Sequence, residues 1–157
     1  MAKLTITGSP ALSIDFVGLP SVNTHYGQHR WAKAQHTAEW RLEAREKAYE
    51  HTMWNFDPLV RRALVVMNVY PPYEEISDIH NVWVKAILDG FTDAEVWVDD
   101  EWAFVPLVLW AWAGISEERH ANGRKAKLTR IDVYELDKYI VNGDQQVLPA
   151  GRKRYGI

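Results

Sequence analysis

The chain has 157 residues, of which 47% are hydrophobic, and a formal net charge of −3 at pH 7. This length and composition suit one domain with its own core, and the slightly acidic charge argues against a protein that coats nucleic acid by bulk electrostatics. The sequence contains no cysteine, which excludes a disulfide framework, a thiolate zinc site and a cysteine nucleophile, so any metal must bind to oxygen or imidazole.

The first half of the chain predicts two short strands followed by a helix. Residues 4–7 and 12–17 alternate in part between apolar and polar side chains, with turn residues between them. Residues 34–53 are rich in Ala, Glu, Arg and Lys and place Ala44 and Ala48 at helical spacing. This pattern predicts an amphipathic helix.

The second half predicts a buried strand, a second helix and two further strands. Residues 63–70 are rich in valine and stop at two prolines, and residues 78–91 start at a good N-cap. Residues 102–113 and 127–136 predict strands joined as a hairpin by the polar loop 116–123. Together these elements predict one small α+β (mixed α/β) domain, with a mixed sheet and two helices.

The chain carries no targeting or membrane signal that we can recognise. Residues 1–10 lack the charged-then-apolar pattern of a signal peptide, and the apolar run 103–115 is too short to span a bilayer. We therefore expect a cytoplasmic protein without a membrane partner, in the host cytoplasm if the protein is phage-encoded.

The chemistry-bearing residues concentrate around the second predicted helix. A helix starting near Asp78 places Asp78, Asn81, Lys85 and Asp89 on one face, because three- and four-residue steps return to the same side. This polar stripe is either exposed or lines a site. Taken singly, Asp78 is most simply an N-cap, and Lys85 a solvent-facing helix residue.

A second acidic group, formed by Asp99, Asp100 and Glu101, follows the helix. A short return of the chain would bring these carboxylates back against the start of the helix. Clustered carboxylates repel one another unless a hard cation such as Mg²⁺ binds them. Such a cation polarises a phosphodiester and lowers the pKa of a bound water, while a lysine offsets charge on the phosphate oxygens. Alone, Asp99 and Asp100 are most simply part of a solvated turn.

Basic residues outside this group are candidates for contacts with a DNA backbone. A site rich in carboxylates must overcome repulsion from phosphates, which requires basic neighbours. The candidates lie before the first long helix and in the loop before the last strand: His25, His29, Arg30, Lys33, Arg119, Arg124, Lys125, Lys127 and Arg130. The segment 138–157 ends in a further basic group and is expected to be a separate tail.

The acidic segments also resemble a known signature. Residues 78–81, 85–91 and 98–100 are similar to the RusA family of Holliday junction resolvases, particularly its phage-carried members, in which an Asp-x-Asp-Asn motif, a Lys-x-x-x-Asp helix and an Asp-Asp pair follow one another. Residues 18–26 resemble the family's early Pro-Ser-x-Asn segment. The resemblance covers roughly residues 1–137, which we expect to form a RusA-like nuclease domain.

The resemblance implies a homodimer that binds branched DNA and nicks four-way junctions symmetrically, in recombination or repair. It further implies that Asp78 and Asp100 are catalytic ligands of Mg²⁺, that Lys85 is the catalytic lysine, and that Asp99 is a neighbouring ligand. Asn81, with Asp89 and Glu101, would support the site. The apolar run 102–112 is a candidate for the dimer interface, although a buried core strand would read the same way.

Two departures from the signature bear on the chemistry. Lys85 stands one residue further from the asparagine than in the shortest family members, and His80 replaces the second aspartate. Histidine is softer and neutral, and it suits Mn²⁺ better than Mg²⁺. His80 is therefore a metal ligand, a group that positions or deprotonates the attacking water, or the mark of a weakly active member whose acidic group is completed by Glu74, Glu75 or Glu101.

Three rival functions follow from the same residues. The first is an endonuclease of the same architecture that prefers flaps or forks. The second is a protein that binds branched DNA without cutting it. The third is a structural or regulatory phage protein in which the acidic stripe is only a solvated face.

Overall fold

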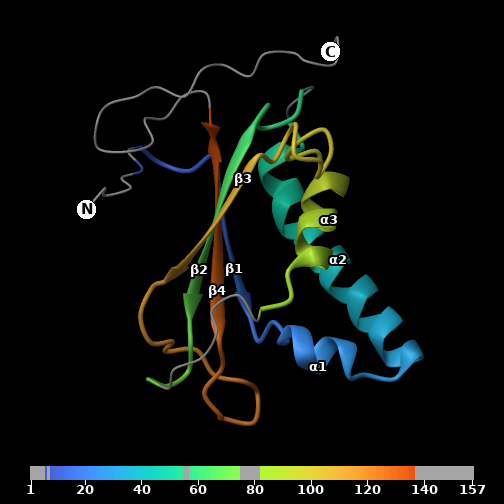
Figure 1. The fold of residues 1–157 in the computed structure, drawn as a ribbon, viewed down its shortest axis with the longest axis vertical. Helices are drawn as coiled ribbons and strands as arrows, with labels where there is room; N and C mark the ends of the chain where they lie inside the picture. The colour runs from blue at the N-terminus through green and yellow to red at the C-terminus, as the bar shows by residue number, and fades with distance from the viewer. Residues whose placement is uncertain (1–5, 7, 55–56, 75–81, 137–157) are drawn as a thin grey trace.

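The computed structural model describes residues 6, 8–54, 57–74 and 82–136. This part of the chain forms a small single domain with a mixed four-stranded sheet and three helices, as the predicted α+β class requires (Figure 1). The elements in chain order are β1 (Leu12–Val17), α1 (Val22–Tyr26), α2 (Arg30–Thr52), β2 (Ala63–Tyr70), α3 (Lys85–Asp93), β3 (Leu107–Trp112) and β4 (Leu128–Glu135).

The sheet has the strand order β1-β4-β2-β3. The last strand in sequence, β4, lies inside the sheet and is antiparallel to both β1 and β2. β2 and β3 are parallel, with α3 in the connection between them. The predicted hairpin between the last two strands is therefore wrong. An apolar run such as β3 looks the same in sequence whether it pairs with β2 or with β4, so the pattern could not identify the neighbour.

The three helices lie on one side of the sheet, which makes a two-layer domain (Figure 1). β1 alternates strictly, and its buried residues Leu12, Ile14 and Phe16 join the core beneath the helices. α2 contributes Ala44 and Ala48 to the same core, as their helical spacing predicts. The sheet therefore supplies a rigid base on which α2 and α3 pack.

α3 packs closely against α2 through Gly90. A Cβ atom added at this glycine would lie 2.4 Å from the carbonyl oxygen of Arg41 and 2.7 Å from the Cβ of Ala44. Next to this contact, the guanidinium of Arg41 donates to both carboxylate oxygens of Asp93, at 2.5 and 2.7 Å. Gly90 thus lies inside α3 and lets the two helices approach.

Several predicted boundaries shift. α2 begins at Arg30, four residues before the predicted start, and α1 is an additional short helix capped by the hydroxyl of Ser21, which accepts from the N–H of Thr24 at 3.0 Å. β3 begins only at Leu107, because the chain turns at Glu101, whose carbonyl accepts from two backbone N–H groups. Of the predicted strand 4–7 only Ile6 is described, and the segment 138–157 lies outside the described residues.

The second predicted helix starts later than expected. α3 begins at Lys85, and the residues directly before it are not helical: Val82 forms an isolated bridge with Ser21, and Val84 has φ −121° and ψ −2°. A single helix over residues 78–91 is therefore wrong, because residues 82–84 are not helical; Lys85 and Asp89 of the predicted stripe share α3, and Asp78 and Asn81 lie outside the described residues. Within the described ranges, no helix is both long and apolar enough to cross a membrane.

Candidate active site

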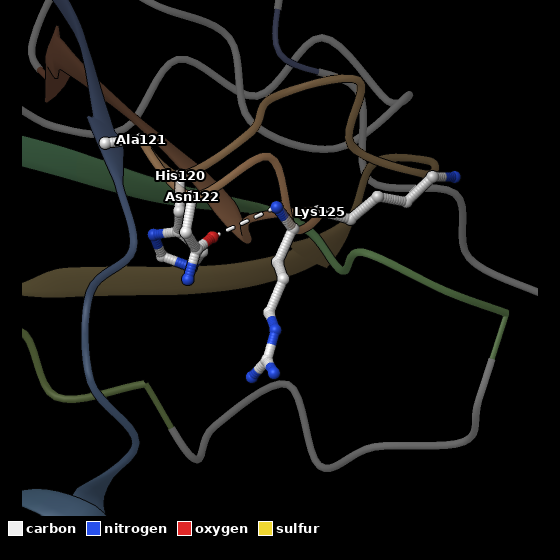
Figure 2. Close-up of a pocket in the computed structure, with 5 residues that line it drawn as sticks. His120, Ala121, Asn122 and Lys125 are labelled. Atoms are coloured by element: carbon white, nitrogen blue, oxygen red, sulfur yellow. Dashed lines mark hydrogen bonds between the residues drawn. The ribbon is translucent and has the colours of Figure 1, made fainter.

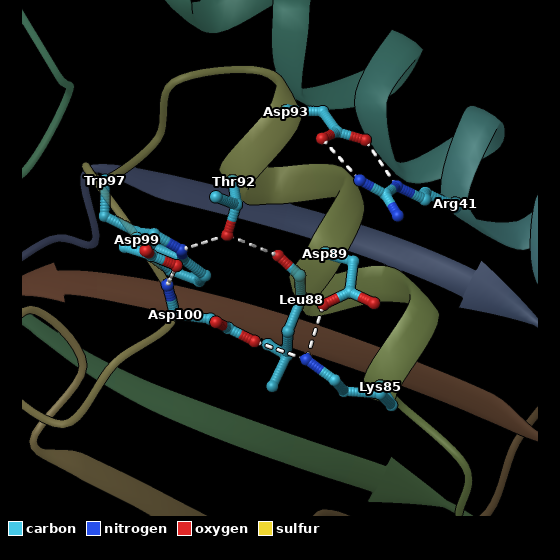
Figure 3. Close-up of polar contacts among 9 residues, drawn as sticks. All are labelled: Arg41, Lys85, Leu88, Asp89, Thr92, Asp93, Trp97, Asp99 and Asp100. Atoms are coloured by element: carbon cyan, nitrogen blue, oxygen red, sulfur yellow. Dashed lines mark hydrogen bonds and ion pairs between the residues drawn. The ribbon is translucent and has the colours of Figure 1, made fainter.

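Lys85 lies between two carboxylates at the start of α3. Its Nζ donates to Oδ1 of Asp89 at 2.6 Å, one helical turn further on, and to Oδ2 of Asp100 from the loop after the helix. About 62% of the Lys85 side chain remains exposed, against 24% for Asp89 and 30% for Asp100. The three side chains form a charged group at the surface that an incoming ligand can reach (Figure 3).

Trp97 anchors the loop that returns Asp100 to Lys85. Its indole Nε1 donates to the hydroxyl of Thr92 at 2.7 Å, and that hydroxyl donates to the carbonyl of Leu88 at 3.1 Å (Figure 3). The indole is almost fully buried and meets the ring of Phe91 edge-on, with 5.8 Å between ring centroids. The loop is therefore fixed onto the last turns of α3, and Asp100, three residues later, lies back against the first turn.

The turn that starts this return uses a strained residue. Glu95 has φ +60°, a left-handed conformation that a non-glycine residue adopts rarely, and the next N–H, of Val96, donates to the carbonyl of Phe91 at 3.0 Å. The short return expected from the position of Asp99 and Asp100 in sequence is thus present. Trp97 and Thr92, which hold it, were not identified from the sequence, because an indole and a threonine give no signal of pairing across a turn.

The contacts around Lys85 shift the protonation equilibria of its group. The hydrogen bond from Lys85 lowers the pKa of Asp100 below its ordinary value, and partial burial opposes this only in part. The hydrogen bonds to Asp100 and then to Asp89 raise the pKa of Lys85. At neutral pH the group therefore holds an ionised carboxylate and a full ammonium charge, as a cation ligand and a phosphate contact both require.

The other predicted members of the site have different placements. Asp99 accepts the backbone N–H of Asp100 at 2.7 Å through its Oδ1, so it shapes the loop, and Glu101 is exposed at the following turn. Asp78, His80 and Asn81 lie outside the described residues. Within the described residues, no three His, Asp or Glu side chains come together as a metal-binding group.

The segment that leads into α3 is attached to α1. The N–H of Trp83 donates to the carbonyl of Pro20 at 2.9 Å, and the indole of Trp83 stacks on the imidazole of His25, with 3.6 Å between centroids and 14° between planes. Both rings are buried. Residues 18–26 therefore help to position Lys85, which follows Trp83 by two residues.

His25 was a candidate for contacts with DNA phosphates, and its placement does not suit that role. Only 2% of the residue is exposed, and burial lowers the pKa of the imidazole, which favours the neutral form. Its Nδ1 has no hydrogen-bond partner among the described residues. No local pattern around His25 indicates that it packs inward against Trp83, which lies far along the chain.

The remaining basic candidates fall into two groups. Arg130 does not project freely, because its guanidinium donates to both carboxylate oxygens of Asp15 on the sheet, at 2.7 and 3.0 Å, and Lys127 is half-buried. Lys33 lies over the ring of Tyr26, with Nζ 4.4 Å from the centroid. The exposed candidates are His29, Arg30, Arg119 and Arg124, and Lys125 on the same loop is half-buried.

The loop before β4 forms a shallow basic hollow. It is lined by His120, Ala121, Asn122, Arg124 and Lys125 (Figure 2). Asn122 shapes it by accepting the N–H of Arg124 at 3.0 Å, and the Nζ of Lys125 lies 5.6 Å from the ring centroid of Tyr73. The loop also touches the segment before α1, since a Cβ at Gly18 would lie 3.0 Å from His120. The same segment of the chain thus contacts the basic loop through Gly18 and the residues before Lys85 through Pro20.

Comparison with known proteins adds no relative. No protein-family model matches the chain, and no curated protein matches it. The assignment of a function therefore depends on the site residues and on the resemblance of their sequence pattern.

Proposed function

We propose that this protein is a metal-dependent endonuclease of the RusA type that resolves four-way DNA junctions by paired nicks. The observation that carries the proposal is the contact between Lys85 and Asp100. The resemblance implies that Lys85 is the catalytic lysine and that Asp100 is a metal ligand. They are 15 positions apart in sequence. The anchored loop makes them neighbours, as a shared catalytic role requires.

The described residues fit a hard divalent cation in type, because they offer carboxylate oxygens. Asp100 and Asp99, with Asp78 from the resemblance and His80 as a further candidate ligand, would hold Mg²⁺ or Mn²⁺. When bound, the cation would polarise the scissile phosphate and lower the pKa of a water. The retained charge on Asp100 supports this role, because a protonated carboxyl binds a cation poorly.

Lys85 would act on the phosphate directly. Its ammonium is shared between Asp89 and Asp100 and remains largely exposed. A phosphate that approaches the group can take one of these contacts, so that the lysine offsets the negative charge that grows on the phosphate oxygens. Asp89 would keep the ammonium in place during this exchange, as a positioning residue one turn along the helix.

The exposed basic loop would contact the DNA backbone away from the scissile bond. Arg119, Arg124 and Lys125 supply positive charge to a chain whose net charge is negative. The contacts from this loop through Gly18 and Pro20 to Trp83 give it a fixed relation to Lys85. Backbone contacts of this kind orient a duplex without reading its sequence.

Cleavage assays on three substrates test this proposal. Purified protein is incubated with a four-way junction, a flap and a plain duplex at matched salt, in Mg²⁺ and in Mn²⁺. We expect paired symmetric nicks on the junction and slower cutting of the other two. Preferred cutting of the flap would identify a related nuclease with another substrate, and tight binding without cutting in either metal would identify a non-catalytic DNA-binding protein.

The two metals also test the role of His80. If the histidine is a ligand, cleavage should be faster in Mn²⁺ than in Mg²⁺, because imidazole binds Mn²⁺ more readily. Equal and high rates in the two metals would count against that role and leave His80 as a group that acts on the water.

A further inference from the structure

Two large aromatic side chains are exposed at the corner where α1 meets α2. Trp31, in the first turn of α2, is 78% exposed, and Tyr26, the last residue of α1, is 64% exposed. Within the described part of the chain, the indole of Trp31 makes no ring contact and no hydrogen bond, and only its backbone N–H is bonded. Both rings are therefore available to a second molecule.

The same corner is basic in a chain that is acidic overall. Residues 16–38 contain no aspartate or glutamate, although the whole chain has 21 of these residues against 18 of lysine and arginine. Arg30 is exposed, and the Nζ of Lys33 lies 4.4 Å from the ring centroid of Tyr26. At about 100° per residue, Arg30 lies between Lys33 and Trp31 around the helix. The corner thus carries a ring at each end and two cations between them.

The backbone of the corner is fixed by contacts that leave these side chains exposed. The side-chain amide nitrogen of Gln28 lies 2.8 Å from Nδ1 of His36, which holds the connection between the two helices against α2. The N–H of Trp31 donates to Nδ1 of His29 at 3.4 Å, and His29 is the N-cap of α2. A ligand that binds here therefore meets side chains on an ordered helix end, and little backbone entropy is lost on binding.

The corner is also connected to the candidate active site. His25, which precedes Tyr26 in α1, stacks on the indole of Trp83, two residues before Lys85. The corner lies at the same end of the molecule as the basic loop before β4 (Figure 1). DNA bound at the corner would therefore have a fixed relation to Lys85.

We propose that this corner surface, formed by Tyr26, Arg30, Trp31 and Lys33, binds unpaired bases of DNA at a branch point. The indole of Trp31 stacks on a base, and Arg30 and Lys33 contact the phosphates next to it. Stacking tolerates any sequence, because every base has an aromatic face. The inference deepens the proposed function, and it rests on that function in taking branched DNA as the ligand.

Rings and cations together favour single-stranded DNA over the other occupants of such a surface. A duplex keeps its bases stacked on each other, so an indole can reach none of them without unstacking. A second copy of this chain that met itself here would bring the cations Arg30 and Lys33 against the same cations. The unpaired strand at a branch offers open base faces and phosphates side by side, which matches both kinds of side chain.

Binding to single-stranded DNA without divalent metal tests the inference. The affinity for a labelled oligothymidylate is measured by fluorescence anisotropy. Trp31→Ala should weaken binding by about 5-fold or more, the effect of losing one base-stacking contact, and Trp31→Phe should keep most of the affinity. Trp54→Ala is the matched control and should bind like the wild type. Trp54 is 83% exposed just beyond the other end of α2, where Glu50 and Asp57 flank it in sequence.

The salt dependence of the same binding separates the ring from the cations. Arg30→Gln with Lys33→Gln should reduce the slope of log affinity against log salt by about 0.7 for each lost phosphate contact on a single strand. Trp31→Ala removes no charge, so it should lower the affinity without changing the slope. A change of slope in Trp31→Ala would contradict a stacking role.

Cross-linking identifies the contact directly. A forked DNA carries 5-iododeoxyuridine either in its single-stranded arm next to the branch or in its duplex, and ultraviolet light joins this base to an aromatic side chain that stacks on it. Peptide mapping should find the single-stranded label on Trp31 and the duplex label elsewhere. A label on Trp54 in place of Trp31 would overturn the proposal. If Trp31→Ala unfolds, this map of the wild type decides the outcome.

Three results of the binding assay would also overturn the proposal. These are no binding of oligothymidylate by the wild type, binding that Trp31→Ala leaves unchanged, and an equal loss in Trp54→Ala. Binding to vesicles of anionic phospholipid that depends on Trp31, with no effect of Trp31 on DNA binding, would assign the surface to a membrane instead. None of these assays involves cleavage, so the nuclease proposal can fail while this inference stands, and the reverse.

Discussion

Lys85 shows how one side chain can be prepared for a charged ligand by two others. Its ammonium is held by Asp89 on the same helix and by Asp100 from a separate loop, while most of the side chain stays exposed. An ion pair of this exposure contributes little to stability, about 0–1 kcal/mol. These ion pairs therefore contribute little to the fold, and the loop that brings Asp100 must be stabilised by other contacts.

Removal of the contact that anchors this loop should destabilise the protein. Thr92→Val preserves shape but leaves the buried indole N–H of Trp97 without its acceptor at 2.7 Å. An unsatisfied buried donor costs about 1–3 kcal/mol. Urea denaturation should show this loss in the free energy of unfolding. Thr37→Val on α2 is the matched control, because its hydroxyl bonds the carbonyl of Lys33 in the same way but anchors no loop. An equal effect in both variants would contradict the role of Trp97.

The ion pair between Arg41 and Asp93 should make part of the stability depend on pH. The hydrogen bonds from Arg41 hold the pKa of Asp93 below its ordinary value of 3.8. The pair's contribution is therefore fully present above pH 3.8 and is lost as the pH falls through the lower folded-state value. Asp93→Asn should reduce the free energy of unfolding by about 0.5–1 kcal/mol at pH 7, and by progressively less as the pH falls below 3.8. A difference that is constant with pH, measured by denaturation, would refute this.

The close packing of α3 on α2 depends on Gly90. Glycine inside a helix normally lowers stability, so Gly90→Ala should stabilise α3 by about 1 kcal/mol if space were available. The contact of 2.4 Å to the carbonyl of Arg41 predicts the opposite. We expect Gly90→Ala to lower the free energy of unfolding by about 1–3 kcal/mol, measured by thermal or urea denaturation. A gain in stability would show that the helices can separate at no cost.

At the level of elements, the sequence predicts what is periodic and misses what depends on distant partners. The alternation of Leu12, Ile14 and Phe16 and the spacing of Ala44 and Ala48 are local patterns, and they locate β1 and α2. The partner of β3 is not a local property. Its apolar residues suit either neighbour, so the hairpin with β4 was wrong.

The start of α3 was misplaced for the same reason. Val82 and Trp83 have apolar side chains that a helix accepts, but their backbone groups bond Ser21 and Pro20, which are about 60 residues earlier in the chain. The pattern of side chains along a segment does not show contacts with residues so far away in the chain. The expected return of Asp100 to the start of the helix is nevertheless present, because Lys85 and Asp100 both follow the misplaced segment in the chain.

At the scale of the whole molecule, the basic side chains differ in whether they are free to contact DNA. Arg124 is exposed, whereas Arg130 already donates to Asp15. Arg124→Ala with Lys125→Ala should weaken binding to a four-way junction and reduce the slope of log affinity against log salt by about 1 for each lost phosphate contact. Binding is measured without divalent metal, so that the DNA stays intact. Arg130→Ala is the control, because Asp15 already holds its guanidinium, and it should have a smaller effect. Equal effects would show that the loop before β4 is not the preferred contact.

Phosphodiester cleavage by Lys85 and Asp100 together is the central proposal for this protein. Its most direct test is the single-turnover rate of junction cleavage in Mg²⁺ for wild type, Asp100→Asn and Lys85→Ala, with junction binding measured in parallel. Loss of a group that stabilises the reacting phosphate should slow cleavage by about 100-fold or more in each variant while binding persists. Glu43→Gln, which removes a carboxylate paired with Lys47 on α2, should cut at the wild-type rate. Wild-type cleavage by Asp100→Asn or by Lys85→Ala would contradict the claim.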